Sequence, residues 1–316
     1  MNTTAPPASQ PIEVLSWNAT VTREVVDPKN TALPGAQAED IFANMWTTIE
    51  PQQLWKLVDV VELWRYRELL WLLAWPDIQV RYKQTVLGVV WAVLQPLAMM
   101  LVFSMIFGRI GQMRSGDLPY PLFVLAGLLP WLYFSNGISS ASQSIVNNQN
   151  LITKVYFPRL LIPMGAIAAG FVDFAISMGL LALMGGIYGV LPGLGILMLG
   201  ILLPVLVVVT LAVGTLLSAL TVKYRDFKHI VPFMVQLWMF MTPAIYLHGT
   251  DSFGWPLRVL LPLNPAYGLI VNYRAAVLNG EFDFYALIIS SFVSLCVLCL
   301  SSWYFCRIER EFADVI

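Results

Sequence analysis

The stretch Val86–Phe107 reads VLGVVWAVLQPLAMMLVFSMIF and contains no Asp, Glu, Lys, Arg or His. An α-helix rises about 1.5 Å per residue, so about 20 consecutive apolar residues cross the hydrocarbon core of a bilayer. Val86–Phe107 is long enough to do this. The stretch therefore predicts a membrane-spanning helix, and it indicates an integral membrane protein.

The composition of the whole chain agrees with this prediction. Of its 316 residues, 58% are hydrophobic and 12% are charged, and the mean hydropathy is +0.71. Soluble domains are about 25% charged, so an ordinary cytosolic enzyme is excluded. The net charge of −1 excludes a chain that binds nucleic acid through a basic surface. Cys296, Cys299 and Cys306 lie in one apolar stretch and indicate neither a disulfide framework nor a metal site.

Similar apolar runs, each bounded by charged or turn-forming residues, predict six spans. They cover about residues 86–107, 120–142, 160–188, 194–221, 231–247 and 284–305. We expect an all-α integral membrane protein whose residues 85–306 form a six-helix transmembrane domain. Residues 307–316 are then a cytoplasmic C-terminus.

The residues before the first span divide into two segments. Residues 1–50 carry early prolines and no basic region followed by an apolar run, which predicts a flexible cytoplasmic tail without a signal peptide. Within residues 51–84, the apolar stretch Leu63–Trp75 is too short to span and predicts an amphipathic helix in the interface plane. That helix either anchors the N-terminal part or shapes an entrance between subunits. Its candidate interface residues are Arg65, Arg67, Glu68 and Trp71.

The positions of Lys and Arg predict the orientation, because cytoplasmic loops carry an excess of both. With six spans the two termini share a side. The basic residues nearer the spans on that side are Lys56, Arg65, Arg67, Arg81, Lys83, Lys154, Arg159, Lys223, Arg225, Lys228, Arg307 and Arg310. The opposite side carries only Arg109, Arg114, Arg258 and Arg274. We therefore expect both termini in the cytoplasm.

The segment between the fifth and sixth spans contains two apolar pieces that are too short to cross a bilayer. The second, Pro265–Leu278, is punctuated as a helix, with Asn264 as N-cap and Gly280 just past its end. Two such pieces predict a re-entrant hairpin, which is tolerated at membrane depth only when buried in protein or facing water. Two helices lying flat on the outer leaflet remain the alternative.

Asp173 is the only Asp, Glu, Lys or Arg well inside a predicted span. An intramembrane acid is expensive to bury, and it marks either a functional site or a polar contact between helices. We favour the structural interpretation, in which Asp173 is protonated or hydrogen-bonded, over ion coupling. His229 and His248 are far apart in the topology, so no metal site is expected.

Two predicted cytoplasmic loops combine cations with aromatic residues. Asn147–Pro163 reads NNQNLITKVYFPRLLIP, and Thr221–Ile230 reads TVKYRDFKHI. Positive-inside topology explains the charges, but exposed aromatics suggest a docking surface for a cytoplasmic protein. The phosphate-binding pattern GxxxxGK[ST] is absent from the sequence, so energy for active transport must come from a partner or an ion gradient.

Aromatic residues recur in the first and fifth predicted spans. Most aromatics in spans simply pack, but flat aromatic faces beside hydroxyl groups are also what sugar rings use. The candidate channel-lining residues are Trp91, Phe103, Phe107, Phe233, Trp238, Phe240 and Tyr246.

Four ordered stretches resemble one known family. They are RYRELLWLLAWPDIQVRYKQTVLGVVWAVLQPL at Arg65–Leu97, the whole of Tyr120–Pro163, KYRDFKHIVPFMVQLWMFMTPAIY at Lys223–Tyr246 and NPAYGLIVNYRAAVLNG at Asn264–Gly280. They are similar to the permease subunits of type-2 ABC exporters, in particular those that export O-antigen, capsule and teichoic-acid polysaccharides. The resemblance covers about residues 46–310 and weakens at His248–Trp255.

The resemblance implies a homodimer of permeases in the bacterial cytoplasmic membrane, bound to two ATPase subunits that hold ATP and Mg²⁺. It implies that coupling helices fall at Asn147–Arg159 and Lys223–His229, and that spans one and five line a path between protomers. The cargo would be a glycan on an undecaprenyl lipid carrier, entering from the membrane lipid. The coupling residues so implied are Asn150, Lys154, Tyr156, Phe157, Arg159, Lys223, Arg225 and Asp226.

Three other functions stay open at this point. A lipid or drug exporter would keep the same superfamily and change the cargo. An ion-coupled secondary carrier would depend on Asp173. A glycosyltransferase would need large soluble loops with paired carboxylates, which the sequence lacks.

Overall fold

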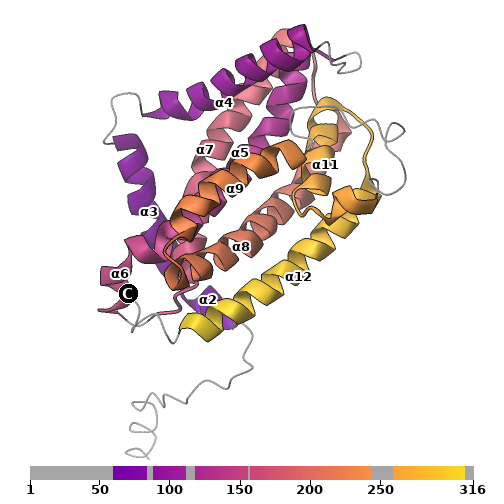
Figure 1. Ribbon diagram of the computed structural model, residues 1–316. Helices are drawn as coiled ribbons and strands as arrows, with labels where there is room; N and C mark the ends of the chain where they lie inside the picture. The colour runs from indigo at the N-terminus through magenta and orange to yellow at the C-terminus, as the bar shows by residue number, and fades with distance from the viewer. Residues whose placement is uncertain (1–59, 84–87, 112–117, 156, 243–258, 310–316) are drawn as a thin grey trace, which may run out of the picture. The chain divides into compact units, whose positions relative to one another are not determined.

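The computed structural model describes residues 60–83, 88–111, 118–155, 157–242 and 259–309. All of them belong to one compact unit, Gln53–Ile316. The described part is helical and contains no strand, which confirms the predicted all-α class (Figure 1). The predicted tail at residues 1–50 lies outside the described residues, as do Tyr156 and Tyr246.

The helices follow the predicted order along the chain. The N-terminal group is α2 Val60–Arg65, α3 Arg67–Lys83, α4 Val89–Phe103 and the π-helix η1 Ser104–Ile110. The middle group is α5 Tyr120–Asn147, α6 Gln149–Ile152, α7 Leu161–Tyr188, η2 Leu194–Met198 and α8 Leu199–Lys223. The last group is α9 Phe227–Met241, η3 Leu261–Leu263, α11 Tyr267–Leu278 and α12 Phe284–Ile308.

Five helical stretches in the described part are long and apolar enough to cross a membrane. They are Val89–Ile110, Tyr120–Asn147, Leu161–Tyr188, Leu194–Lys223 and Phe284–Ile308. The chain is therefore a multi-pass membrane protein. The remaining predicted span, 231–247, is described only as far as Thr242 and corresponds to α9. The count of six spans stays a prediction.

The helix α5 continues beyond the predicted end at residue 142 to Asn147. Its second half is rich in serine, a residue that competes with helical hydrogen bonding unless its hydroxyl is accommodated. Here the hydroxyls bond back to carbonyls of the preceding turn: Ser139 to Ser135, Ser142 to Ser139 and Ser144 to Ala141, each at 2.8 Å. The polar stretch therefore remains helical.

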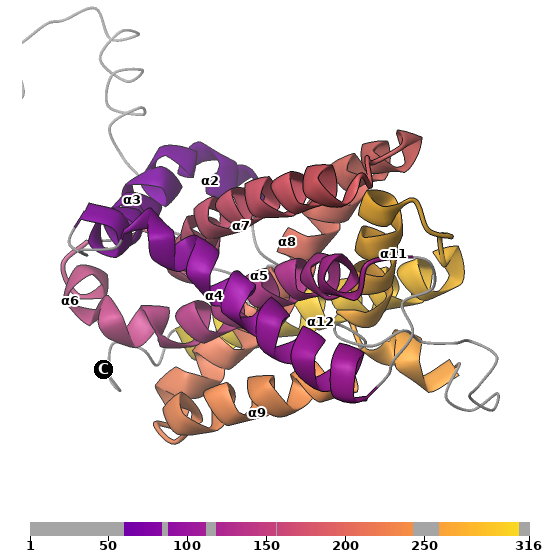
Figure 2. The same ribbon diagram turned by 90° about the horizontal axis from the view of Figure 1, so that it is seen from above.

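The core is organised around α5, which is mostly buried, whereas the first span is mostly exposed. The helix α5 packs against α7 and α8, and Figure 2 shows it between α7 on one side of the view and α9 on the other. Small residues allow the close approach of α5 and α8. A Cβ atom on Gly137 would lie 2.6 Å from Thr210 Cγ2, and one on Gly214 would lie 3.0 Å from Ala141 Cβ.

The helix α11 begins at Tyr267, two residues after the predicted start. The N-cap residue is Ala266, so the prediction of Asn264 as N-cap is wrong; Asn264 Oδ1 instead accepts a hydrogen bond from Ala266 N at 3.1 Å. Most of α11 is buried against α5, α8 and α12, and a Cβ atom on Gly268 would lie 2.2 Å from the Ala286 carbonyl oxygen. Such burial favours a segment packed within protein over a helix lying flat on lipid. The hairpin itself stays a prediction, since residues 243–258 lie outside the described part.

Candidate functional site: loops, membrane acid and aromatic faces

The first predicted coupling loop folds as the single turn α6 followed by an irregular segment. Asn150 and Lys154 are exposed on it. Phe157, expected on the same surface, is only 4% exposed. Its ring belongs to an apolar group, the loop-base cluster, which contains Ile145, Ile152, Phe157, Leu161, Ile162, Ala219, Val222, Phe305 and Ile308. The expectation that Phe157 is exposed is therefore wrong, while its role in coupling stays a prediction.

Arg159 fixes the far end of the same loop to α12. Its Nε lies 3.9 Å from Glu309 Oε1, its backbone N–H donates to the same oxygen at 3.4 Å, and its Nη1 donates to the Glu309 carbonyl oxygen. Arg159 is half-buried. The side chain assigned to docking is thus engaged with the end of α12 in this structure.

The second predicted loop is a tight turn between α8 and α9. Lys223, Arg225 and Asp226 are all exposed on it, and the Phe227 N–H donates to the Tyr224 carbonyl at 3.1 Å. Val222, which immediately precedes the turn, belongs to the loop-base cluster together with Phe157. The two loops therefore rest on one apolar base, although they are far apart in the sequence.

The predicted interface segment forms two helices, α2 and α3, joined at Tyr66. All four candidate residues are exposed: Arg65, Arg67, Glu68 and Trp71. Leu69, Leu70 and Leu73, on the opposite side, pack against the loop-base cluster. The segment is thus helical, and α3 continues through Pro76 to Lys83. Its place in the interface plane stays a prediction.

Asp173 on α7 has partners that the sequence did not reveal. It forms an ion pair with Arg81 and accepts a hydrogen bond from the Tyr82 hydroxyl, both on α3. Burial, and then the hydrogen bond to Asp173, raise the pKa of the Tyr82 phenol, which keeps it a donor. Neutralisation within the protein is what an intramembrane acid requires when it is not part of an ion path.

The ion pair belongs to a longer contact between α3 and α7. A Cβ atom on Gly165 would lie 3.1 Å from Leu73 Cβ. Leu73 and Arg81 are two helical turns apart on α3, and Gly165 and Asp173 are two turns apart on α7. The two helices therefore run parallel and in register over this length, closely packed at one end and ion-paired at the other.

The candidate channel-lining aromatics divide into two groups. Trp91, Phe233 and Phe240 are exposed, with 55%, 63% and 54% of their surface accessible. Phe103, Phe107 and Trp238 are half-buried and pack against the core. Trp238 and Phe134 form an edge-to-face pair at 5.2 Å between ring centroids, so the Trp238 ring packs against the core of this chain.

Within the described ranges, no three His, Cys, Asp or Glu side chains come together as a metal site requires. The polar contacts in the described part include some within single helices, as for Ser139, and some that join one helix to another, as for Arg81 and Asp173.

Comparison with known proteins identifies the family. A model of the ABC-2 type transporter family matches residues 68–278. The O-antigen export system permease protein RfbA of Myxococcus xanthus is 31% identical over 81% of this chain and 98% of its own length. RfbA of Klebsiella pneumoniae is 26% identical over 79% and 95%, and the polysialic acid transport protein KpsM of Escherichia coli is 26% identical over 65% and 79%. This chain therefore belongs to the ABC-2 type transporter family.

Proposed function

We propose that this chain is the permease subunit of an ATP-driven exporter of lipid-linked polysaccharide. The observation that carries the proposal is its likeness, over nearly the full length of the relative, to an O-antigen export permease. The multi-pass helical fold agrees with a conduit, since five helices are long enough to span. The relatives reported above are named for O-antigen export or polysialic acid transport, which favours a polysaccharide over a lipid or drug as cargo.

The power for export comes from a separate ATPase subunit. The sequence has no GxxxxGK[ST] pattern, so this chain does not form a P-loop of its own. ATP and Mg²⁺ are held by the partner, of which two copies bind a homodimer of this permease. This arrangement places the loops and both termini in the cytoplasm of a bacterium.

The exposed parts of the two loops form the docking surface. On this proposal the partner contacts Asn150 and Lys154 on one side and the turn Lys223–Asp226 on the other. The loop-base cluster beneath them joins residues of α5, α7, α8 and α12. Because protein interiors are close-packed and transmit strain, a push on either loop moves these helices together.

The passage for the glycan runs between protomers along the exposed faces of α4 and α9. Those faces carry Trp91, Phe233 and Phe240, which are the candidate lining residues still exposed. Sugar rings stack on such faces through their apolar C–H side. The undecaprenyl carrier enters past α3 from the membrane lipid.

An ion-coupled carrier is disfavoured by the surroundings of Asp173. A carboxylate that relays protons must change its charge during transport, whereas this one is paired with Arg81 and Tyr82. Removal of its charge would leave Arg81 without that counter-ion. The contacts of Asp173 with Arg81 and Tyr82 therefore favour a structural role for this acid.

The experiment that tests the proposal uses the permease purified with its ATPase partner and reconstituted in vesicles. We expect lipid-linked glycan to stimulate ATP hydrolysis, and the glycan to appear on the far side only when ATP is supplied. A matched complex whose partner lacks its P-loop lysine should bind glycan but not move it. Stimulation by hydrophobic drugs in place of glycan would support the lipid or drug exporter.

A further inference from the structure

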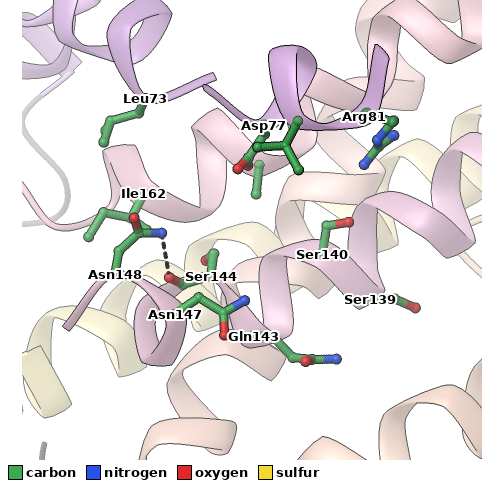
Figure 3. A pocket seen from close by; sticks show the side chains of 12 residues that line it. Leu73, Asp77, Arg81, Ser139, Ser140, Gln143, Ser144, Asn147, Asn148 and Ile162 are labelled. Carbon is green, nitrogen blue, oxygen red and sulfur yellow. Dashed lines mark hydrogen bonds between the residues drawn. The ribbon is translucent and has the colours of Figure 1, made fainter. Parts of the chain in front are cut away.

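A polar pocket of about 500 Å³ lies between α3, α5 and α7 (Figure 3). Small-molecule sites typically measure about 300–1,000 Å³, so the space suits a small ligand or part of a larger one. Figure 3 shows Asp77 and Arg81 on α3 above Ser140 and Ser144 on α5, with Asn147 and Gln143 along the edge below. None of these residues belongs to the exposed faces of α4 and α9.

The side chains on the α5 wall form one polar face. Ser140, Gln143 and Asn147 are spaced at i, i+3 and i+7, which brings them to the same side of the helix. The facing wall carries Asp77 and Arg81, one turn apart on α3. Hydroxyl, amide and carboxylate groups thus face one another across the pocket.

Four of these polar side chains are not used in holding the fold together. Among the described residues, Asp77, Ser140, Gln143 and Asn147 form no side-chain hydrogen bond, unlike Ser144, whose hydroxyl bonds to Ala141. Arg81 is engaged by Asp173. Asp77 and Asn147 are exposed, whereas Ser140 and Gln143 are half-buried, and half-buried polar groups gain from a partner that replaces lost water. The four uncommitted side chains are therefore available to a ligand.

The charge of the wall decides which ligand fits. With Arg81 paired to Asp173, the lining offers an acid and no second cation, so a phosphate or pyrophosphate would meet the Asp77 carboxylate. Neighbouring hydroxyl groups of a ligand can donate to that carboxylate and exchange hydrogen bonds with amides and hydroxyls. We propose that this pocket binds the vicinal hydroxyls of a sugar unit of the exported glycan.

This inference rests on the proposed function and adds a recognition site within each protomer. The α5 wall leads directly into Asn148 and α6, the first turn of the loop that would face the ATPase. A sugar held between α3 and the end of α5 would therefore contact the base of that loop. Occupancy of the pocket is expected to raise ATP hydrolysis.

The test uses the full chain with its ATPase partner in phosphatidylcholine nanodiscs. The probe is tritium-labelled polymer, released by mild acid from the lipid-linked glycan that accumulates when the partner is inactive. We expect Asp77→Leu and Gln143→Leu each to weaken binding by about tenfold, because each removes hydrogen bonds to hydroxyls. Gln79→Leu is the matched control, since Gln79 is exposed on α3 and does not line the pocket. Equal binding by all three variants and the wild type overturns the proposal.

Photo-crosslinking places the ligand independently of affinity. Benzoylphenylalanine at Val80, which lines the pocket, is expected to capture the labelled polymer. Benzoylphenylalanine at the neighbouring Gln79 is not expected to capture the polymer. Capture at both positions or at neither contradicts the site, provided that each complex hydrolyses ATP at the wild-type basal rate.

Two further comparisons complete the test. One distinguishes a sugar from a lipid headgroup as the ligand, and the other distinguishes failure of the pocket proposal from failure of the proposed function. Glycerol headgroups also carry vicinal hydroxyls, so a parallel sample contains phosphatidylglycerol. If that lipid crosslinks at Val80 and the polymer does not, the sugar assignment is overturned. If glycan stimulates the wild type and the pocket variants equally, only the pocket fails. If glycan stimulates nothing, the proposed function fails.

Discussion

The indole Nε1 of Trp238 donates a hydrogen bond to Asn264 Oδ1 at 3.1 Å and so ties α9 to the segment before α11. The same amide donates to Thr242 Oγ1 at 2.9 Å, and its oxygen also accepts from Ala266 N. One asparagine thus joins the end of α9 to the start of α11. Trp238 belongs to this connection, whereas Phe233 projects from the exposed face of α9.

Trp238 and Phe233 should therefore respond differently to substitution. Trp238→Phe keeps an aromatic ring but loses the hydrogen bond, and we expect a loss of stability of about 1 kcal/mol. Phe233→Ala should leave stability within about 0.5 kcal/mol and slow glycan export. Thermal unfolding of the purified protein and the amount of surface glycan measure the two effects. Slower export without loss of stability at Trp238 would instead place its ring in the passage.

The ion pair between Arg81 and Asp173 should behave as a coupled unit. Asp173→Asn and Arg81→Gln are each expected to lower the unfolding temperature, because each leaves the other partner without its counter-charge. The double variant should lose less than the sum of the single losses, with a coupling of about 0.5–3 kcal/mol. Export by Asp173→Asn should remain ATP-dependent and insensitive to the proton gradient. Additive losses would show that the two side chains are not linked.

Phe157 and Lys154 lie close together in one loop but should play different parts. Phe157→Ala empties a buried site in the loop-base cluster, and we expect a loss of about 3–5 kcal/mol. Lys154→Glu changes an exposed charge, so stability should hold while glycan-stimulated ATP hydrolysis falls. The two variants are distinguished by co-purification with the ATPase and by the rate of glycan-stimulated ATP hydrolysis. A stable Phe157→Ala protein with lowered stimulation would return Phe157 to the docking surface.

Gly268 should tolerate no side chain, because a Cβ atom there would lie 2.2 Å from the backbone oxygen of Ala286 on α12. We expect Gly268→Ala to push α11 away from α12 and to cost about 1–3 kcal/mol. Gly179→Ala on α7 is the matched control, since nothing lies within 4 Å of a Cβ atom there. The control should be neutral or slightly stabilising, because alanine favours helices. Equal unfolding temperatures for the two variants would contradict the close packing of α11.

Much of the fold could be predicted because bilayer thickness fixes the length of a span and charges interrupt the apolar runs. Five of the predicted spans appear as helices long enough to cross. The end of α5 was missed, since hydropathy falls in its serine-rich half while backbone bonding by Ser139 and Ser144 keeps it helical. Hydropathy thus locates the part of a helix that faces lipid, but it does not locate the end of a helix whose last turns are polar.

The contacts within the candidate site depend on residues far apart in the chain, and so they could not be predicted. Asp173 was recognisable as an unusual acid, but its partner Arg81 lies 92 residues away. Asp77 lies only one turn from Arg81 along α3, yet the ion pair forms with Asp173, which the packing of α3 on α7 brings close. Phe157 was expected to be exposed because it lies in a predicted cytoplasmic loop, whereas its ring belongs to a cluster that includes residues of α8 and α12.

The central claim is that this chain supplies the conduit and borrows its power from an ATPase. It is tested most directly by measuring glycan export into vesicles that contain the permease with and without the partner. We predict ATP-dependent accumulation of glycan with the partner present, and none with the permease alone under any ion gradient. Transport by the permease alone would contradict the claim.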